Sequence, residues 1–255
     1  MEITLNGLVT HYERIGRGPV LVMLHGWGCD WQIFAPIIPE LSNHFQLLIP
    51  DLPAFGQTHT PIDVWSSPQY VEWLIEFIKE TVGNKPFALI GHSYGGKVAA
   101  LYTATQSKYP QPNHLILCDI AGIPGTLSFR QLLQQQVLRA IPNDFKRRLP
   151  TKLSRRLLQL TGSSTDHFTA NPLQKQILQK VVREDIRQQL PMISVPTLLI
   201  WGDLDTETPI TDAHQFQRLI PGSELSVFEN VGHFPFIDQP ARFVTEVSMF
   251  LQSYE

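Results

Sequence analysis

Gly91-His92-Ser93-Tyr94-Gly95 joins the apolar run at residues 87–90 to a helix-like stretch that begins at Gly96. A Gly-x-Ser-x-Gly pattern between a strand and a helix is typical of a nucleophile elbow, a tight turn that exposes a serine hydroxyl above a sheet. Glycines flank such a serine because the turn forces backbone segments close together. The alternative is an ordinary strand-to-helix turn with a serine cap. The nucleophile interpretation of Ser93 therefore depends on whether the rest of the chain supplies catalytic partners.

The chain has 255 residues and a mass of 29.0 kDa, which suits one α/β domain with an insertion. No apolar run approaches the roughly 20 residues that span a bilayer, so we expect no stable membrane insertion. The N-terminus lacks a basic region followed by an apolar stretch, and this favours the cytoplasm. The two cysteines, Cys29 and Cys118, have no metal-binding spacing and are predicted to be free thiols in a reducing compartment.

Short apolar runs alternate with helical patterns along most of the chain. Such alternation predicts an α/β fold with a mostly parallel central sheet and helices on both faces. Two further runs, at residues 3–5 and 10–15, flank Asn6-Gly7 and predict an antiparallel hairpin. The apolar runs are residues 20–24, 45–49, 87–90, 114–118, 197–201 and 224–228, and the helical patterns are residues 31–41, 69–81, 96–107, 211–220 and 242–252.

The alternation stops between Asp119 and Pro196, where helix patterns occur without a convincing strand. Apolar residues there repeat at a spacing of four, as in Leu173, Ile177 and Val181. We therefore predict an inserted helical cap, or lid, at residues 122–190, and a core formed by residues 1–121 and 191–255.

Charge is distributed unevenly between these parts. Residues 126–190 contain 12 basic and 4 acidic residues, whereas the remainder of the chain contains 8 basic and 19 acidic residues. The lid is thus predicted to be a basic segment on an acidic body. Nucleic acid is not expected as a partner, because the basic segment is not interleaved with aromatic residues.

A serine nucleophile needs a base that is itself oriented by an acid. His233 follows the last apolar run in a glycine-flanked loop, and we predict it to be the base. Asp205 lies in the loop that follows the apolar run at residues 197–201, and it is the favoured acid. Asp119, in a neighbouring loop, is the alternative acid. Asp203 and Glu207 are interpreted as solvated turn residues.

The oxyanion of an acyl-transfer reaction is normally held by two backbone N–H groups. One is predicted to belong to Tyr94, directly after the nucleophile, and the other to Trp27 in the Leu24-His25-Gly26-Trp27-Gly28 loop. The predicted substrate pocket contains His25, Gly26, Phe129 and Phe234.

The segments HGWG (25–28), DLPAFG (51–56), GHSYGG (91–96), WGDLDTETP (201–209) and GHFP (232–235) together resemble the α/β-hydrolase superfamily over essentially the whole chain. The order of Ser93, Asp205 and His233 is that of the family. Within it, the sequence is similar to small carboxylesterases such as the pimeloyl-acyl-carrier-protein methyl ester esterase group. Ala54 departs from the glycine usual at that position.

The resemblance implies ester hydrolysis through a Ser-His-Asp triad and an acyl-enzyme, with no metal and no cofactor. It also implies an acidic acyl-carrier partner held by lid arginines, although these arginines can equally be the solvated faces of amphipathic helices. The arginines concerned are Arg139, Arg147, Arg148, Arg155 and Arg156.

Two other functions remain open at this stage. One is hydrolysis of a carbon–carbon bond in a vinylogous diketone, against which His92 argues, because such hydrolases usually carry asparagine before the serine. The other is a hydrolase-like receptor or carrier for a small apolar ligand.

Overall fold

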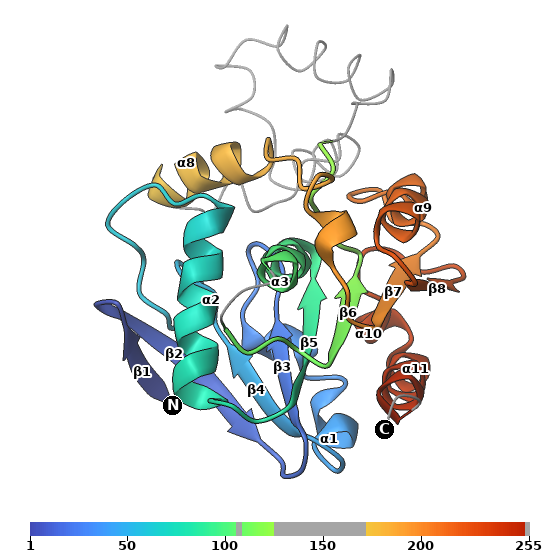
Figure 1. The fold of residues 1–255 in the computed structure, drawn as a ribbon, viewed down its shortest axis with the longest axis horizontal. Coiled ribbons are helices and arrows are strands. Elements are labelled where there is room, and N and C mark those ends of the chain that lie inside the picture. The colour runs from blue at the N-terminus through green and yellow to red at the C-terminus, as the bar shows by residue number, and fades with distance from the viewer. Residues whose placement is uncertain (106–108, 125–171, 253–255) are drawn as a thin grey trace, which may run out of the picture.

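A computed structural model describes residues 1–105, 109–124 and 172–252. Within these residues, eight strands form one sheet in the order β1-β2-β4-β3-β5-β6-β7-β8 (Figure 1). β2 pairs antiparallel with β1 and β4, and every later pair is parallel, which confirms the predicted mostly parallel sheet. The strands are β1 (Glu2–Leu5), β2 (Leu8–Ile15), β3 (Val20–Leu24), β4 (Gln46–Pro50), β5 (Phe87–His92), β6 (His114–Cys118), β7 (Thr197–Gly202) and β8 (Glu224–Phe228).

The first two strands form the expected hairpin. Asn6 and Gly7 have φ angles of 48° and 84°, both in the left-handed region. A two-residue turn of this type matches the right-handed twist of the strands that it joins.

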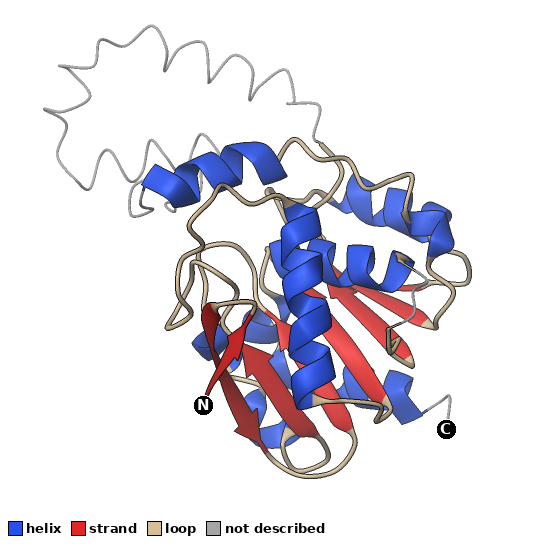
Figure 2. Ribbon diagram, turned by 60° about the vertical axis from the view of Figure 1, so that its left-hand side comes forward, coloured by secondary structure: helices blue, strands red, loops and turns tan. Residues whose placement is uncertain are grey.

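Helices cover both faces of the sheet (Figure 2). On one face, buried residues of α2 (Ser67–Thr81), α3 (Ser93–Ala104), α8 (Pro172–Val181) and α9 (Ile210–Leu219) join one apolar cluster. On the other face, η1 (Trp31–Phe34), α1 (Ile38–Leu41), α10 (Pro235–Asp238) and α11 (Pro240–Gln252) pack in a second cluster. The remaining short helix is η2 (Leu190–Met192). None of the helices in the described ranges has the length and apolar character needed to cross a membrane.

β3, β5 and β7 are buried on both faces, so their residues alternate between these two clusters. Val20, Val22 and Leu24 of β3 belong to the first cluster, while Leu21 and Met23 belong to the second. Continuously apolar strands are therefore what this sheet requires.

One helix prediction was wrong. Residues 31–41 form two short helices, η1 and α1, instead of a single one. Pro36 lies between them, and it has no N–H to continue the hydrogen bonds of a helix.

The chain that leaves β6 lies against the chain that returns after α8. The amide of Ile186 donates a 3.0 Å hydrogen bond to the carbonyl of Gly122. Gly122 has a φ of +138°, and a β-carbon there would lie 2.6 Å from Cδ1 of Ile186. Among the described residues between β6 and β7, α8 and η2 are helical and no strand occurs, while most of the predicted lid, residues 125–171, lies outside the described residues.

Lys97, a buried residue of α3, bonds to the chain segment at the end of α8. Nζ of Lys97 donates to the carbonyls of Val181 and Glu184 at 2.6 and 3.1 Å, and it lies 3.2 Å from Oε2 of Glu184. Glu184 also accepts hydrogen bonds from the amide and hydroxyl of Ser67 at the start of α2. Three separate elements therefore meet at one ion pair.

Candidate active site

The turn at Ser93 has the backbone of a nucleophile elbow. Ser93 has a φ of +51°, in the left-handed region that costs a residue with a side chain about 1–2 kcal/mol. A β-carbon on Gly91 would lie 2.5 Å from Cα of Gly96, and one on Gly95 would lie 2.4 Å from the carbonyl oxygen of His25. Both flanking positions therefore require glycine, and Ser93 stands where β5 ends and α3 begins.

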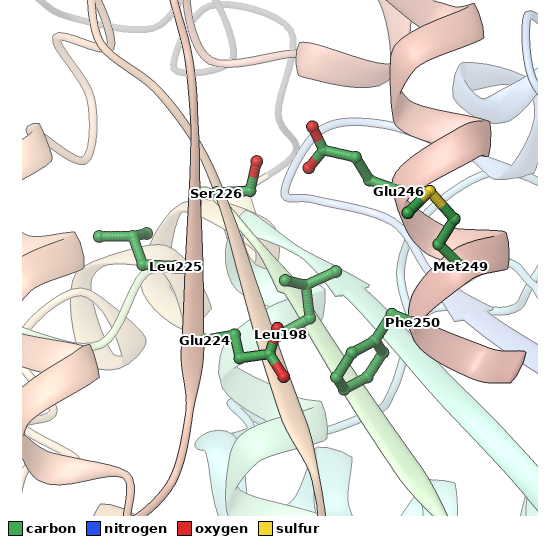
Figure 3. A pocket seen from close by; sticks show the side chains of 7 residues that line it. All are labelled: Leu198, Glu224, Leu225, Ser226, Glu246, Met249 and Phe250. Carbon is green, nitrogen blue, oxygen red and sulfur yellow. The ribbon is translucent and has the colours of Figure 1, made fainter. Parts of the chain in front are cut away.

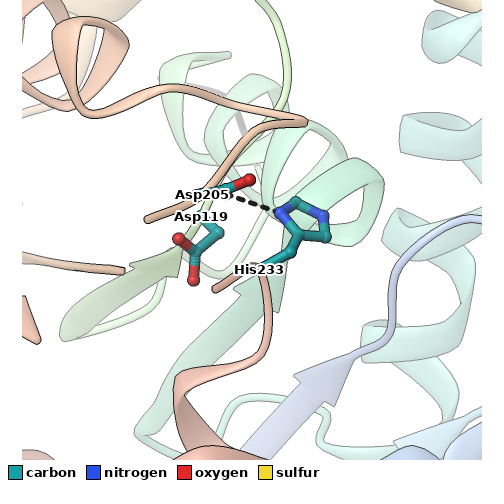
Figure 4. Close-up of side chains that lie close together, drawn as sticks. All are labelled: Asp119, Asp205 and His233. Atoms are coloured by element: carbon teal, nitrogen blue, oxygen red, sulfur yellow. Dashed lines mark hydrogen bonds and ion pairs between the residues drawn. The ribbon is translucent and has the colours of Figure 1, made fainter. Parts of the chain in front are cut away.

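His233 and Asp205 meet at the carboxyl edge of the sheet, although 28 positions separate them in the sequence (Figure 4). Nδ1 of His233 lies 2.7 Å from Oδ2 of Asp205. The Asp205 carboxylate also accepts from the amide of Glu207 at 2.7 Å and from the hydroxyl of Thr208 at 2.6 Å. It is thereby fixed as an acceptor, so that Nδ1 carries the proton and Nε2 is left for chemistry.

The charges of this pair stabilise each other. Burial raises the pKa of Asp205, but hydrogen bonding and charge from His233 outweigh it, and the net pKa lies below the usual value. Burial likewise lowers the pKa of His233, yet Asp205, followed by Glu207 and Asp119, raises it overall. The site is thus suited to hold an imidazolium during a reaction.

Asp119, the rival acid, occupies a different position. Its Oδ1 accepts from the amide of Gly202 at 3.0 Å, and its Oδ2 accepts from the thiol of Cys118. Burial, with the nearby charge of Asp205, raises the pKa of Asp119 well above its usual value. Asp119 therefore lies beside the His233–Asp205 pair, in surroundings that disfavour its charged form (Figure 4).

Asp119, Asp205 and His233 each offer a ligand atom within 4.8 Å of the others. A metal there would have to displace the hydrogen bond between Nδ1 and Asp205, and burial disfavours the charged form of Asp119 that would bind a cation. These three residues fit a hydrogen-bonded acid–base pair better than a metal site.

The loop after β3 approaches the elbow. A β-carbon on Gly26 would lie 2.8 Å from Nδ1 of His92 and 3.2 Å from Cβ of Ser93, so a side chain there would force these groups to shift. The half-buried ring of Trp27 packs edge-on against Phe55 and Tyr94, with centroids 4.8 and 5.5 Å away. The loop that contains Trp27 therefore lies beside Ser93, and the N–H groups of Trp27 and Tyr94 remain the predicted oxyanion donors.

The predicted pocket residues have different surroundings. His25 is fully buried, accepts at Nε2 from the amide of Leu52 at 2.9 Å and donates from Nδ1 to the carbonyl of Gly26 at 2.8 Å, which braces the loop. Phe234 is half-buried against the ring of His92 at 4.9 Å. Phe129 lies outside the described residues.

His92 has a role that the sequence analysis missed. Its Nε2 donates to the backbone carbonyl of His233 at 2.8 Å, and the two rings are 4.8 Å apart. Burial, with the charge of His233, lowers the pKa of His92 well below its usual value, so the ring is neutral. This bond joins the residue before Ser93 to the loop of His233. The two residues are 141 positions apart in the sequence, so no local sequence pattern predicts the contact.

Glu207, interpreted from sequence as a solvated turn residue, also reaches this site. Its side chain is 48% exposed, but Oε2 lies 3.6 Å from Nε2 of His233. Asp203 instead accepts from the amide of Val231 at 3.2 Å and holds the two loops together.

A separate groove lies between the edge strand β8 and α11 (Figure 3). It includes Leu198 and Glu224, which pair at the amino ends of β7 and β8, the end opposite to the carboxyl edge that carries His233. The groove is lined by Leu198, Glu224, Leu225, Ser226, Glu246, Met249 and Phe250. It therefore plays no part in the candidate active site.

Curated relatives of this chain include esterases. A pimeloyl-[acyl-carrier protein] methyl ester esterase of Legionella pneumophila (strain Corby) is 31% identical over 252 residues, covering 95% of this chain and 99% of the relative. The corresponding esterase of Vibrio vulnificus (strain CMCP6) is 27% identical over 257 residues, covering 94% and 97%.

Solved structures agree on the fold. A putative lipase from Acinetobacter baumannii AYE superposes with a TM-score of 0.77 at 21% identity, covering 99% of this chain and 90% of that chain. A serine hydrolase involved in carbazole degradation gives 0.75 at 22% identity, covering 99% and 98%. The family model for the alpha/beta hydrolase fold matches residues 19–240. The chain therefore belongs to the α/β-hydrolase family and is a hydrolase whose curated relatives include esterases.

Proposed function

We propose that this hydrolase is a serine carboxylesterase in which Ser93 is the nucleophile, His233 the base and Asp205 the acid. The observation that carries the proposal is the 2.7 Å bond between His233 and Asp205, on a loop that His92 ties to the elbow of Ser93. The left-handed backbone of Ser93 supports it, because strain of this kind persists where the surrounding structure enforces it.

In the proposed mechanism, Nε2 of His233 takes the hydroxyl proton as Ser93 Oγ attacks the ester carbonyl. The backbone N–H groups of Trp27 and Tyr94 hold the oxyanion. The C–O bond to the alcohol then breaks, and His233 gives its proton to the leaving oxygen. Water, deprotonated by the same nitrogen, hydrolyses the acyl-enzyme, while Asp205 stabilises each imidazolium. No metal or organic cofactor enters these steps.

For the substrate, we propose a neutral ester of a carrier-linked acyl chain, in line with the relatives named for pimeloyl-[acyl-carrier protein] methyl esters. The basic lid, proposed as residues 122–190, would meet the acidic carrier through arginines that lie outside the described residues. A cytoplasmic location remains a prediction of the sequence.

The test is hydrolysis of p-nitrophenyl esters of graded acyl length by the wild type and by Ser93→Ala. We expect turnover by the wild type with a chain-length optimum, and a folded variant without turnover. A folded Ser93→Ala protein that remains active would overturn the mechanism.

A fluorophosphonate probe separates the proposal from a receptor role. An activated serine is labelled at Ser93. Absence of labelling in a folded wild type, together with absence of ester turnover, would contradict an esterase. Turnover of a coloured ring-fission product in preference to every ester would instead favour carbon–carbon cleavage.

A further inference from the structure

Each ring nitrogen of His233 faces a carboxylate. Asp205 bonds to Nδ1 at 2.7 Å, whereas Oε2 of Glu207 lies 3.6 Å from Nε2. The two acids belong to one loop, since the amide of Glu207 donates to Oδ1 of Asp205. Glu207 is therefore held beside the catalytic pair by its backbone, while its carboxylate faces the reactive side of the ring.

Nε2 is the nitrogen that the reacting atoms must approach. Within the described part of the chain, no hydrogen bond joins Oγ of Ser93 to His233, and Nε2 has Glu207 as its acidic contact. In ester hydrolysis the proton on Nε2 passes to the alkoxide as the C–O bond breaks, so the alcohol oxygen comes within hydrogen-bond distance of Nε2. Substituents on that alcohol consequently lie near the Glu207 carboxylate.

Among the residues that the structure describes, the other charged groups around His233 do not lie on the side of Nε2 that Glu207 faces. Asp205 is buried, and its carboxylate accepts hydrogen bonds from Nδ1 of His233 and from the hydroxyl of Thr208. Asp119 is buried and accepts hydrogen bonds from Gly202 and Cys118, and His92 is neutral and bonded to the His233 carbonyl. Glu207, half-exposed, supplies the negative charge at the solvent side of Nε2.

We propose that Glu207 is a specificity-determining residue for the alcohol portion of the ester. It favours alcohols that carry a cation or a hydrogen-bond donor, accepts small neutral alcohols, and disfavours alcohols that carry a carboxylate or sulfonate. The inference rests on the proposed ester hydrolysis and names a selectivity that this hydrolysis alone does not require.

The experiment compares three esters of one acyl group whose alcohols differ in charge: choline, its neutral isostere 3,3-dimethylbutanol, and 3-hydroxypropanesulfonate. Because Glu207 is 48% exposed, solvent screens its charge, and we expect kcat/KM for the choline ester to exceed that for the neutral ester by about fivefold. The sulfonate ester should be slower than the neutral one by a similar factor. In Glu207→Gln both ratios should fall toward one.

Glu229→Gln is the matched control, because Glu229 is an exposed acid after β8 and loses the same charge. It should keep the wild-type ratios. Ratios that are equal in the active wild type and in Glu207→Gln overturn the inference while leaving ester hydrolysis standing. If the wild type hydrolyses none of the esters, the proposed function fails first, and the selectivity fails with it.

An NMR titration of the His233 imidazole gives a readout that needs no turnover. The charge of Glu207 helps to raise the pKa of His233, so Glu207→Gln should lower the midpoint and Glu229→Gln should not. A midpoint that is the same in the wild type and in Glu207→Gln would contradict the contact itself.

Discussion

The imidazole of His92 donates a 2.8 Å hydrogen bond from Nε2 to the backbone carbonyl of His233. The carbonyl can only accept, so Nε2 of His92 carries the proton and Nδ1 is the unprotonated nitrogen of a neutral ring. Nδ1 is buried without a hydrogen-bond partner among the described residues. His92 is therefore a positioning residue that acts on the proposed base through its backbone.

Replacing His92 by phenylalanine should keep the ring volume and remove the donor. The buried carbonyl of His233 then loses its partner, which costs about 1–3 kcal/mol of unfolding free energy. We expect kcat to fall while KM changes little, measured beside urea denaturation. His92→Gln, which retains an N–H donor, should recover part of kcat, and an unchanged kcat in His92→Phe would refute the positioning role.

The two buried aspartates should respond differently to replacement by asparagine. Asp205→Asn removes the charge that orients His233, and kcat for a p-nitrophenyl ester should drop by about 10⁴. Asp119→Asn leaves the bond between Asp205 and His233 in place and should cost roughly tenfold or less. Comparable losses in both variants would contradict the assignment of Asp205 as the acid.

Activity and stability should depend on pH in opposite directions through His233. Its pKa is raised in the folded protein, so its stabilising contribution is complete below the unfolded value of 6.5 and is lost as pH rises through the folded pKa. Catalysis needs the neutral ring and appears over that same interval. Urea denaturation and kcat/KM, followed across this range for the wild type, should change oppositely; His233→Gln should lack this stability change.

Asp205 should make the stability of the folded protein depend on pH in the acidic range. Its folded pKa is lowered, so its contribution is present above the unfolded value of 3.8 and is lost as pH falls through the folded pKa. An Asp205→Asn protein that loses stability as steeply as the wild type in acid would contradict this linkage.

Lys97→Met should destabilise the protein without touching the candidate active site. The change leaves Glu184 and the carbonyl of Val181 without their buried donor, at a cost of about 3 kcal/mol. Adding Glu184→Gln should cost less than the sum of the single changes, because the two groups interact. Additive losses in urea denaturation would show that the ion pair is not coupled.

Local patterns were sufficient to predict much of the fold. The apolar runs at residues 20–24 and 114–118 coincide with β3 and β6, because inner strands of a parallel sheet are covered on both faces. The run at residues 224–228 also coincides with a strand, β8, which is less buried because it lies at the edge of the sheet. Residues 31–41 form two short helices where one was predicted, because Pro36 interrupts the helix.

The candidate site was predictable only where a residue has a local signature. Glycines mark Ser93, and a loop after a strand marks His233 and Asp205. His92 and Glu207 carry no such mark, since their roles depend on where two distant loops meet in space. Their side chains also have ordinary alternatives, a buried histidine and a solvated acid, which sequence alone cannot separate from these contacts.

The contact between Gly122 and Ile186 closes the excursion of chain between β6 and β7 at its base. A segment whose two ends are held together can change in length or composition at little entropic cost to the sheet, since closing a longer loop costs only slowly more. The sheet, the elbow and the acid–base pair are thereby insulated from changes in the length of that segment.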